Sequence, residues 1–227
     1  MAANSEPQVF LFLSHILGDN VVDDKGSSLG KIVDVVASLT EPYPVITHIL
    51  LKGDKKKVSS LPWQRVSEVG DKIAAEPQSL EDFREPVLSE GELLLKDTLL
   101  DKQIVDTDGA KVRRVNDLQF LKARGSLHLV HVDVGFRGLM RRVGLEKAMD
   151  LFSRSFFDYT LQDQFISWKF VQPLSSPDLL RLKISQNRLA QLLPADLADI
   201  IEDLDIHKRT AVFQALDVET AAETLEE

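Results

Sequence analysis

The sequence predicts an α+β multidomain protein in which two small β-barrels are followed by an α-helical segment. Three observations carry this prediction: an internal repeat of strand-forming residues, a helical period from Gln186 onward, and a change of charge at the same point. The 227 residues are 44% hydrophobic and 28% charged, which is ordinary globular composition and enough chain for more than one domain.

The repeat aligns two stretches of the chain at a shift of 83 residues. Val21–Gly26 lies over Ile104–Gly109, and Thr47–Ile49 lies over Val130–Val132. Each copy begins with an apolar pair and a tight-turn signal, and continues with two short strands. Short strands at this spacing predict a small barrel or sandwich.

A further match, between two tryptophan segments, has a different shift. Leu61–Val66 resembles Ile166–Val171 at a distance of 105 residues, so the second copy contains 22 extra residues before its tryptophan. We expect Trp63 and Trp168 to be core aromatics at the bottoms of the barrels, with stacking on a ligand as the alternative.

The extra residues form an insert at 137–163 in which apolar residues recur at helical spacing. Basic side chains fall between them, which predicts an amphipathic basic helix over residues 137–157, between two strands of the second barrel. We interpret it as a helix packed on the barrel with solvated arginines. Docking to an acidic partner or to a membrane surface is the alternative.

The repeated unit resembles the PRC-barrel domain, a small β-barrel. The resemblance rests on the turn, strand and tryptophan segments of both copies, and the second copy departs from the pattern at Arg113, where the first has Gly30. It implies PRC-like barrels at residues 1–90 and 91–185. The segments are Val21–Gly26, Gly30–Asp34 and Leu61–Val66 in the first copy, and Ile104–Gly109, Val112–Leu118 and Ile166–Val171 in the second.

From Gln186 onward the apolar residues recur with a period of 3.6, which predicts helices with one apolar stripe. A step of twelve residues places Leu204–Ile206 over Leu216–Val218, so we expect short helices, each packed on a neighbour. Pro194 suits a first helical position, and Asp205 and Asp217 can cap the helices that follow them. The stripe consists of Leu189, Leu192, Leu193, Leu197, Ile200, Ile201 and Leu204.

Residues 186–227 are similar to the beginning of the N-terminal cytosolic domain of MgtE-type magnesium transporters. Leu193–Leu204 carries the similarity, followed by Arg209, Phe213, Leu216 and Ala221–Glu226. The resemblance implies a superhelix of short helices, followed by paired CBS domains and usually a membrane channel. We therefore expect this segment to be a truncated helical domain and the chain to be part of a longer protein.

Acidic residues dominate the same segment, which holds ten acids against three bases and so carries −7 of the total charge of −9. In the MgtE family such acids face acids of the CBS domains, and bound Mg²⁺ relieves their repulsion. The resemblance places one metal ligand of that family on Glu223; an exposed helix-surface glutamate is the alternative. We expect Asp196 and Asp199 to stabilise the first turn of their helix.

Several functional classes are excluded or disfavoured. The acidic balance argues against direct nucleic-acid binding, and the absence of cysteine excludes disulfides and thiolate sites. His128 and His131 are three apart on a predicted strand, so we expect them on opposite faces and not on one metal ion. No nucleophile elbow or phosphate-binding loop is present, and we assign no catalytic residue.

The function expected from the sequence is therefore non-enzymatic. We predict a cytoplasmic regulatory or scaffolding region of a magnesium-transport or magnesium-sensing protein, acting by Mg²⁺-dependent docking of acidic helices onto CBS domains or other domains. The alternative is a PRC-barrel adaptor for RNA processing or ribosome assembly that binds a protein partner. The sequence leaves the oligomeric state open.

Overall fold

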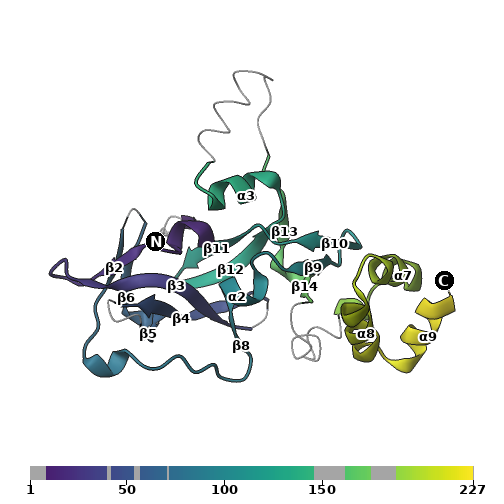
Figure 1. Ribbon diagram of the computed structural model, residues 1–227, viewed down its shortest axis with the longest axis horizontal. Coiled ribbons are helices and arrows are strands. Elements are labelled where there is room, and N and C mark those ends of the chain that lie inside the picture. Colours follow the sequence, from purple (N-terminus) through teal and green to yellow (C-terminus); the bar gives the residue numbers. More distant parts are fainter. Residues whose placement is uncertain are drawn as a thin grey trace, which may run out of the picture.

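The computed structural model of the protein describes residues 9–39, 42–53, 57–70, 72–145, 162–174 and 188–226. It confirms an α+β protein with a curled β-sheet and C-terminal helices (Figure 1). No helix in these ranges is long and apolar enough to cross a bilayer.

The main sheet contains strands of both repeat copies. The main sheet runs β1-β11-β12-β4-β3-β2-β7-β6, with β13 on β12, β5 on β4 and β8 on β3, and a smaller sheet runs β10-β9-β14. The first half contributes β1 (Val9–Phe12), α1 (Leu13–Ile16), β2 (Asn20–Val22), β3 (Ser28–Ser38), β4 (Val45–Lys52), β5 (Val58–Pro62), η1 (Trp63–Arg65), β6 (Val66–Val69), β7 (Ile73–Ala75) and η2 (Leu80–Asp82). The second contributes β8 (Glu92–Leu94), α2 (Leu95–Leu99), β9 (Gln103–Asp106), β10 (Lys111–Arg114), β11 (Asp117–Ala123), β12 (Ser126–Asp133), α3 (Phe136–Arg142), β13 (Phe165–Ser167), η3 (Trp168–Phe170) and β14 (Val171–Pro173).

The two copies have the same strand registers. Asp34 lies opposite Leu50 in β3–β4, and 83 residues later Asp117 lies opposite Asp133 in β11–β12. A β-bulge follows at the same place in each pair, between residues 36 and 37 and between residues 119 and 120. The repeated sequence therefore folds into repeated geometry.

Each copy is completed by the first strand of the other. β1 pairs with β11, where Phe12 lies opposite Gln119, whereas β8 pairs with β3, where Leu94 lies opposite Val36. The copies also meet where β4 pairs with β12. Their paired residues there, Val45 and His128, are themselves 83 positions apart, which places an internal two-fold axis between them.

A single hydrophobic core joins the two copies. Trp63 and Trp168 are 5% and 4% exposed and belong to this core together with residues of both halves, which confirms them as core aromatics. Two separate barrels are consequently not observed in the described residues, where one curled sheet surrounds a shared core. The boundary at residue 90 stays a prediction.

The insert places helix α3 between β12 and β13, as predicted. The helix ends at Arg142 and is followed by Gly144 in the left-handed region (φ +74°), so the predicted helix over 137–157 is interrupted there. Residues 146–157 of that prediction lie outside the described residues. The expectation of solvated arginines is also wrong for Arg141, which is 6% exposed.

The C-terminal segment forms α7 (Pro194–Glu202), α8 (Ile206–Ala215) and α9 (Val218–Glu226), which begin twelve residues apart as predicted. Pro194 occupies the helix start, and the side chains of Asp205 and Asp217 accept backbone N–H groups of α8 and α9. Most of the predicted stripe packs in a second core, together with Val105 of β9 and Leu174 after β14. Leu193 is the exception at 68% exposed, because it precedes α7 instead of lying within it.

Candidate functional site on the acidic helices and the sheet beside them

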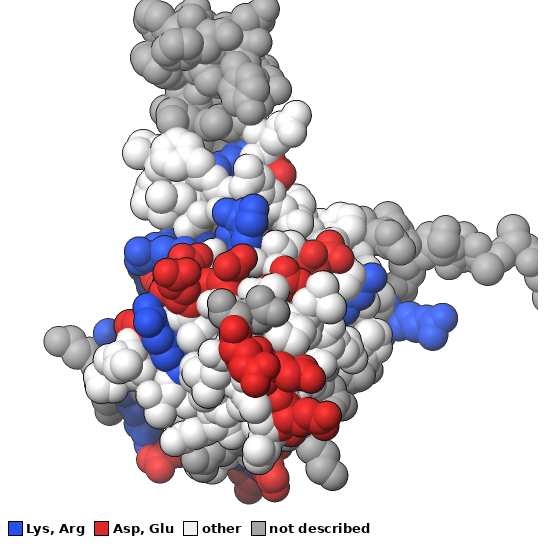
Figure 2. Space-filling model, turned by 90° about the vertical axis from the view of Figure 1, so that its right-hand side faces the viewer, with Lys and Arg blue, Asp and Glu red and all other residues white. Residues whose placement is uncertain are grey.

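The acidic side chains gather on the side of the molecule that carries the C-terminal helices (Figure 2). Glu223 lies on α9 and is exposed. Asp196 lies in the first turn of α7, as expected, but Asp199 lies in the second turn, so the expectation for Asp199 is wrong. Within the described ranges no group of three or more His, Asp or Glu side chains is arranged to hold a metal ion. The role of Glu223 as a metal ligand stays a prediction.

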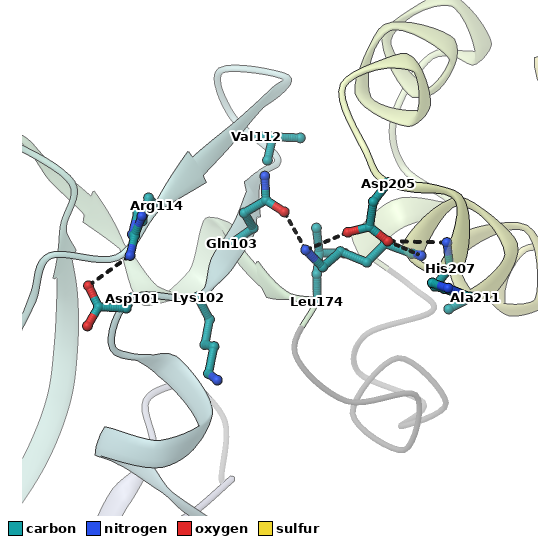
Figure 3. Close-up of a pocket in the computed structure, with 10 residues that line it drawn as sticks. Asp101, Lys102, Gln103, Val112, Arg114, Leu174, Asp205, His207 and Ala211 are labelled. Atoms are coloured by element: carbon teal, nitrogen blue, oxygen red, sulfur yellow. Dashed lines mark hydrogen bonds and ion pairs between the residues drawn. The ribbon is translucent and has the colours of Figure 1, made fainter.

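A groove of about 810 Å³ lies between the smaller sheet and α8 (Figure 3). Lys208 crosses it from the helix: its ammonium lies 2.8 Å from the Asp205 carboxylate and donates to the side chain of Gln103 on β9. The hydrogen bond from Lys208 also lowers the pKa of Asp205. This lysine therefore links the helical segment to the sheet.

Opposing charges pair at the other end of the groove. Asp101 accepts from Arg114 at 3.3 Å and from Arg142 at 2.8 Å, and these contacts, that of Arg142 above all, lower its pKa. The described residues that line the groove include no serine, threonine or cysteine, so they offer no hydroxyl or thiol nucleophile.

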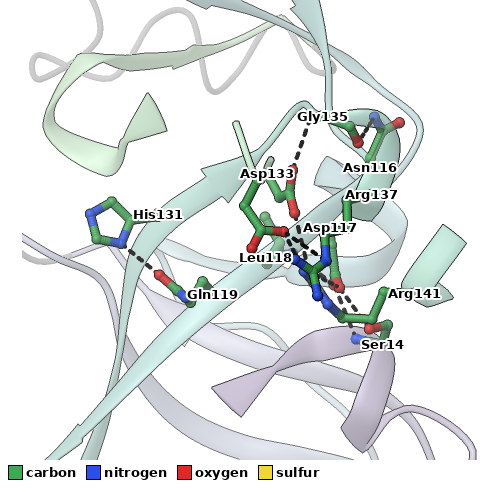
Figure 4. Close-up of polar contacts among 11 residues, drawn as sticks. Ser14, Asn116, Asp117, Leu118, Gln119, His131, Asp133, Gly135, Arg137 and Arg141 are labelled. Carbon is green, nitrogen blue, oxygen red and sulfur yellow. Dashed lines mark hydrogen bonds and ion pairs between the residues drawn. The ribbon is translucent and has the colours of Figure 1, made fainter. Parts of the chain in front are cut away.

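The most buried charged cluster surrounds Arg141 of α3 (Figure 4). Its Nη1 lies 3.1 Å from Asp133 and 3.4 Å from Asp117, its Nη2 lies 2.6 Å from Asp163, and the guanidinium stacks 3.6 Å from the centre of the Phe12 ring. Burial raises the pKa of Asp133, while the N–H of Gly135 and Arg141 counteract this effect. The pKa of Arg141 is raised because its bonds to Asp133 and Asp163 outweigh the opposing effect of burial.

Sequence reasoning missed this cluster, although two glycines signal it. A Cβ on Gly138 would lie 2.5 Å from the Asp133 carboxylate, and one on Gly135 would lie 2.9 Å from the backbone of Gln164. Only glycine permits α3 to approach the sheet so closely. Glycine is otherwise unfavourable inside a helix, so a glycine in a predicted helix is a sequence signal that the helix packs closely on a neighbour.

The prediction that the two histidines of β12 lie on opposite faces is wrong. His128 lies opposite Leu121 and His131 lies opposite Gln119, two residues apart on β11, so both histidines face the same side of the sheet. The cause is the bulge at Val130, which adds one residue between them. His131 hydrogen-bonds Gln119 at 2.8 Å, and burial lowers the pKa of its ring.

The first repeat copy is similar to a known domain family. Residues 9–80 match the PRC-barrel domain. The match spans β1 to the start of η2 and confirms the resemblance for this copy. It ends at residue 80, so the resemblance of the second copy to a PRC-barrel and that of the helical end to MgtE stay predictions. None of the curated proteins compared with the chain matches it.

Within the PRC-barrel match, Asp34 is the buried charged residue of interest, at 6% exposed. Its carboxylate accepts the backbone N–H groups of Val35, Lys96 and Asp97 at 2.7, 2.8 and 3.2 Å. It thereby caps α2, as Asp117 caps α1 by accepting from Ser14. Burial nevertheless raises the pKa of Asp34, because the hydrogen bonds do not fully compensate for lost hydration.

This raised pKa predicts a pH dependence of stability. The folded state holds the Asp34 proton more tightly than the unfolded state, so this group makes folding less favourable as pH rises through the interval from about 4 to its folded pKa. Urea unfolding should therefore show that the free energy of unfolding of Asp34→Asn rises relative to that of the wild type as pH increases across this interval. Above the interval the difference between the two proteins should be constant. A difference that moves in favour of the wild type would mean that the folded pKa is lowered.

Proposed function

We propose that the chain is a non-catalytic regulatory and scaffolding region of a magnesium-transport or magnesium-sensing protein, on the cytosolic side of a membrane. The observation that carries the proposal is the step of twelve residues at which α7, α8 and α9 begin, with acidic side chains on the exposed faces of α7 and α9. Such surfaces repel another acidic domain until a hard divalent cation binds between them. Mg²⁺ would thus favour docking of the C-terminal helices onto that acidic domain.

The barrel is the scaffold in this proposal. We take the second copy as another PRC-like unit, and the support is its identical registers at shifts of 83 and 105 residues. Its small sheet carries the helices through Val105, Leu174 and the contact of Lys208 with Gln103. A rigid support of this kind would hold the acidic helices in a defined orientation.

Magnesium titration tests the proposal. The 227-residue chain should bind Mg²⁺ with a dissociation constant on the order of millimolar or weaker, because one exposed carboxylate supplies few of the oxygens that Mg²⁺ requires. A longer protein that includes paired CBS domains should bind it more tightly. In that longer protein Glu223→Gln should weaken binding by about tenfold, which corresponds to the 10–100-fold cost usual for a perturbed metal site.

Calorimetry of both proteins measures these affinities, with Glu226→Gln on the same helix as the matched control. Micromolar binding by the 227-residue chain would instead show a self-contained site. If the longer protein bound Mg²⁺ no more tightly than the 227-residue chain, the magnesium proposal would be contradicted.

A second candidate function is a PRC-barrel adaptor for RNA processing or ribosome assembly. The match at residues 9–80 favours it, and the acidic helices suit a basic protein partner better than RNA. Co-sedimentation of the chain with ribosomes at physiological salt would place this candidate first.

A further inference from the structure

The surface on which α3 packs has a counterpart in the other repeat copy. Asp117 and Asp133 lie opposite each other beneath α3, and Asp34 and Leu50 form the corresponding pair in β3–β4. Asp163 lies three residues before Ile166, as Val58 lies three residues before Leu61; Ile166 and Leu61 pair at equivalent places on β12 and β4. The internal two-fold relation thus identifies each residue of this counterpart.

A cavity of about 890 Å³ opens at the counterpart, and its lining includes the charged residues Lys96, Asp97, Asp101, Lys102 and Arg142. Asp34 lines it together with Val33, Leu50, Val58 and Leu94. In the second copy the corresponding residues are, in the same order, Asp117, Asn116, Asp133, Asp163 and Phe12, which are the residues beneath or beside α3. The surface that α3 covers in one copy therefore borders a cavity in the other, where Asp34 and Leu50 are 6% and 5% exposed.

The two surfaces share a carboxylate but differ in polarity. Asp117 receives two N–H bonds, one hydroxyl bond and the guanidinium of Arg141. Asp34 accepts three backbone N–H bonds and, in the described part of the chain, forms no ion pair with lysine or arginine, although the nearby charge of Lys96 acts to lower its pKa. The other two acids of the α3 site are replaced by Leu50 and Val58. A matching ligand must consequently be mostly apolar and present one hydrogen-bond donor, best a cation, to Asp34.

We propose that this cavity, named here the Asp34 cavity, binds a short amphipathic helix of a partner protein that covers Leu50 and Val58 and directs one arginine to Asp34. The occupant is a helix because α3 covers the equivalent surface in the second copy. It is apolar around the arginine because Asp133 and Asp163 have no acidic equivalents here. This site is independent of the proposed magnesium function, since it lies on the barrel and not on the acidic helices.

The test uses the complete 227-residue chain with labelled Leu and Val methyl groups. The probe is a capped synthetic peptide with the sequence of residues 135–145, which already fits the equivalent surface. Titration should shift the methyl signals of Leu50, Val58 and Leu94 with a submillimolar dissociation constant. The same peptide with Arg141→Gln should bind about tenfold more weakly, as expected for one lost charge-assisted contact.

Asp34→Asn and Val58→Lys serve as the matched variants of the chain. Asp34→Asn should bind the two peptides with equal affinity, because the difference in their affinity for the wild type arises at the Asp34 carboxylate. Val58→Lys should abolish binding, while Val87→Lys, at an exposed position that does not line the cavity, should leave it unchanged.

Three results would overturn the proposal: no binding at millimolar peptide, equal affinity of the two peptides for the wild type, or methyl shifts at Leu139 and Val143 in place of the cavity. The last would mean that the peptide displaces α3 from its own surface. Peptide-independent shifts at the cavity that grow with protein concentration would assign it to a second copy of this chain and equally contradict a partner helix.

Discussion

Replacement of Arg141 by methionine is expected to lower the free energy of unfolding by about 3–5 kcal/mol at pH 7. Methionine keeps much of the apolar stem, but the change leaves the carboxylates of Asp117 and Asp133 buried without their cation. Both acids are fully buried, so water cannot replace the lost contacts without opening the packing of α3. Urea unfolding followed by tryptophan fluorescence measures the loss, since Trp63 and Trp168 lie in the shared core.

The loss of stability caused by Arg141→Met should become smaller as pH falls. Burial raises the pKa of Asp133, and removal of the arginine would raise it further, so acid protonates and neutralises the stranded carboxyl in the variant. Arg113→Met is the matched control, because Arg113 is exposed on β10 and its replacement should change stability by less than about 0.5 kcal/mol. Equal losses for the two variants would show that the Arg141 cluster is not a special source of stability.

Cleavage of the chain between residues 86 and 90 is expected to leave the two pieces associated. This stretch is exposed and connects the two repeat copies, so a protease site inserted there should be tolerated. After cleavage β1–α1 would still complete the second copy, and β8–α2 would still complete the first. Separation would expose the shared core and remove the caps that Asp34 and Asp117 supply to α2 and α1.

Gel filtration of the cleaved protein in native buffer should therefore show one species of the size of the uncut chain, and two pieces only in denaturant. The uncut protein with the same insertion is the control. Elution as two folded monomers would contradict the exchange of first strands and would support two independent barrels.

Local features of the fold were predictable from the sequence because short-range chemistry determines them. Asp205 and Asp217 stand at helix starts where their side chains reach backbone N–H groups a few residues away, and Pro194 suits the first helical position. Trp63 and Trp168 recur in matching segments, so their common role in the core followed from the repeat. Neither prediction required knowledge of which distant strands pair.

The arrangement of the two copies was decided only by tertiary structure. The repeat shows that the chain holds two similar copies, but two copies with the same pattern offer the first strand of each copy, β1 or β8, two equivalent edges to pair with. The same limitation applies to Val130, whose bulge reverses the predicted face of His131, and to Arg141, whose charge appeared solvated from its helical position. Strand partners and the environments of buried charges depend on residues distant in the sequence, as Asp117 depends on Ser14, 103 positions away. A local pattern carries no information about which of those contacts excludes water best.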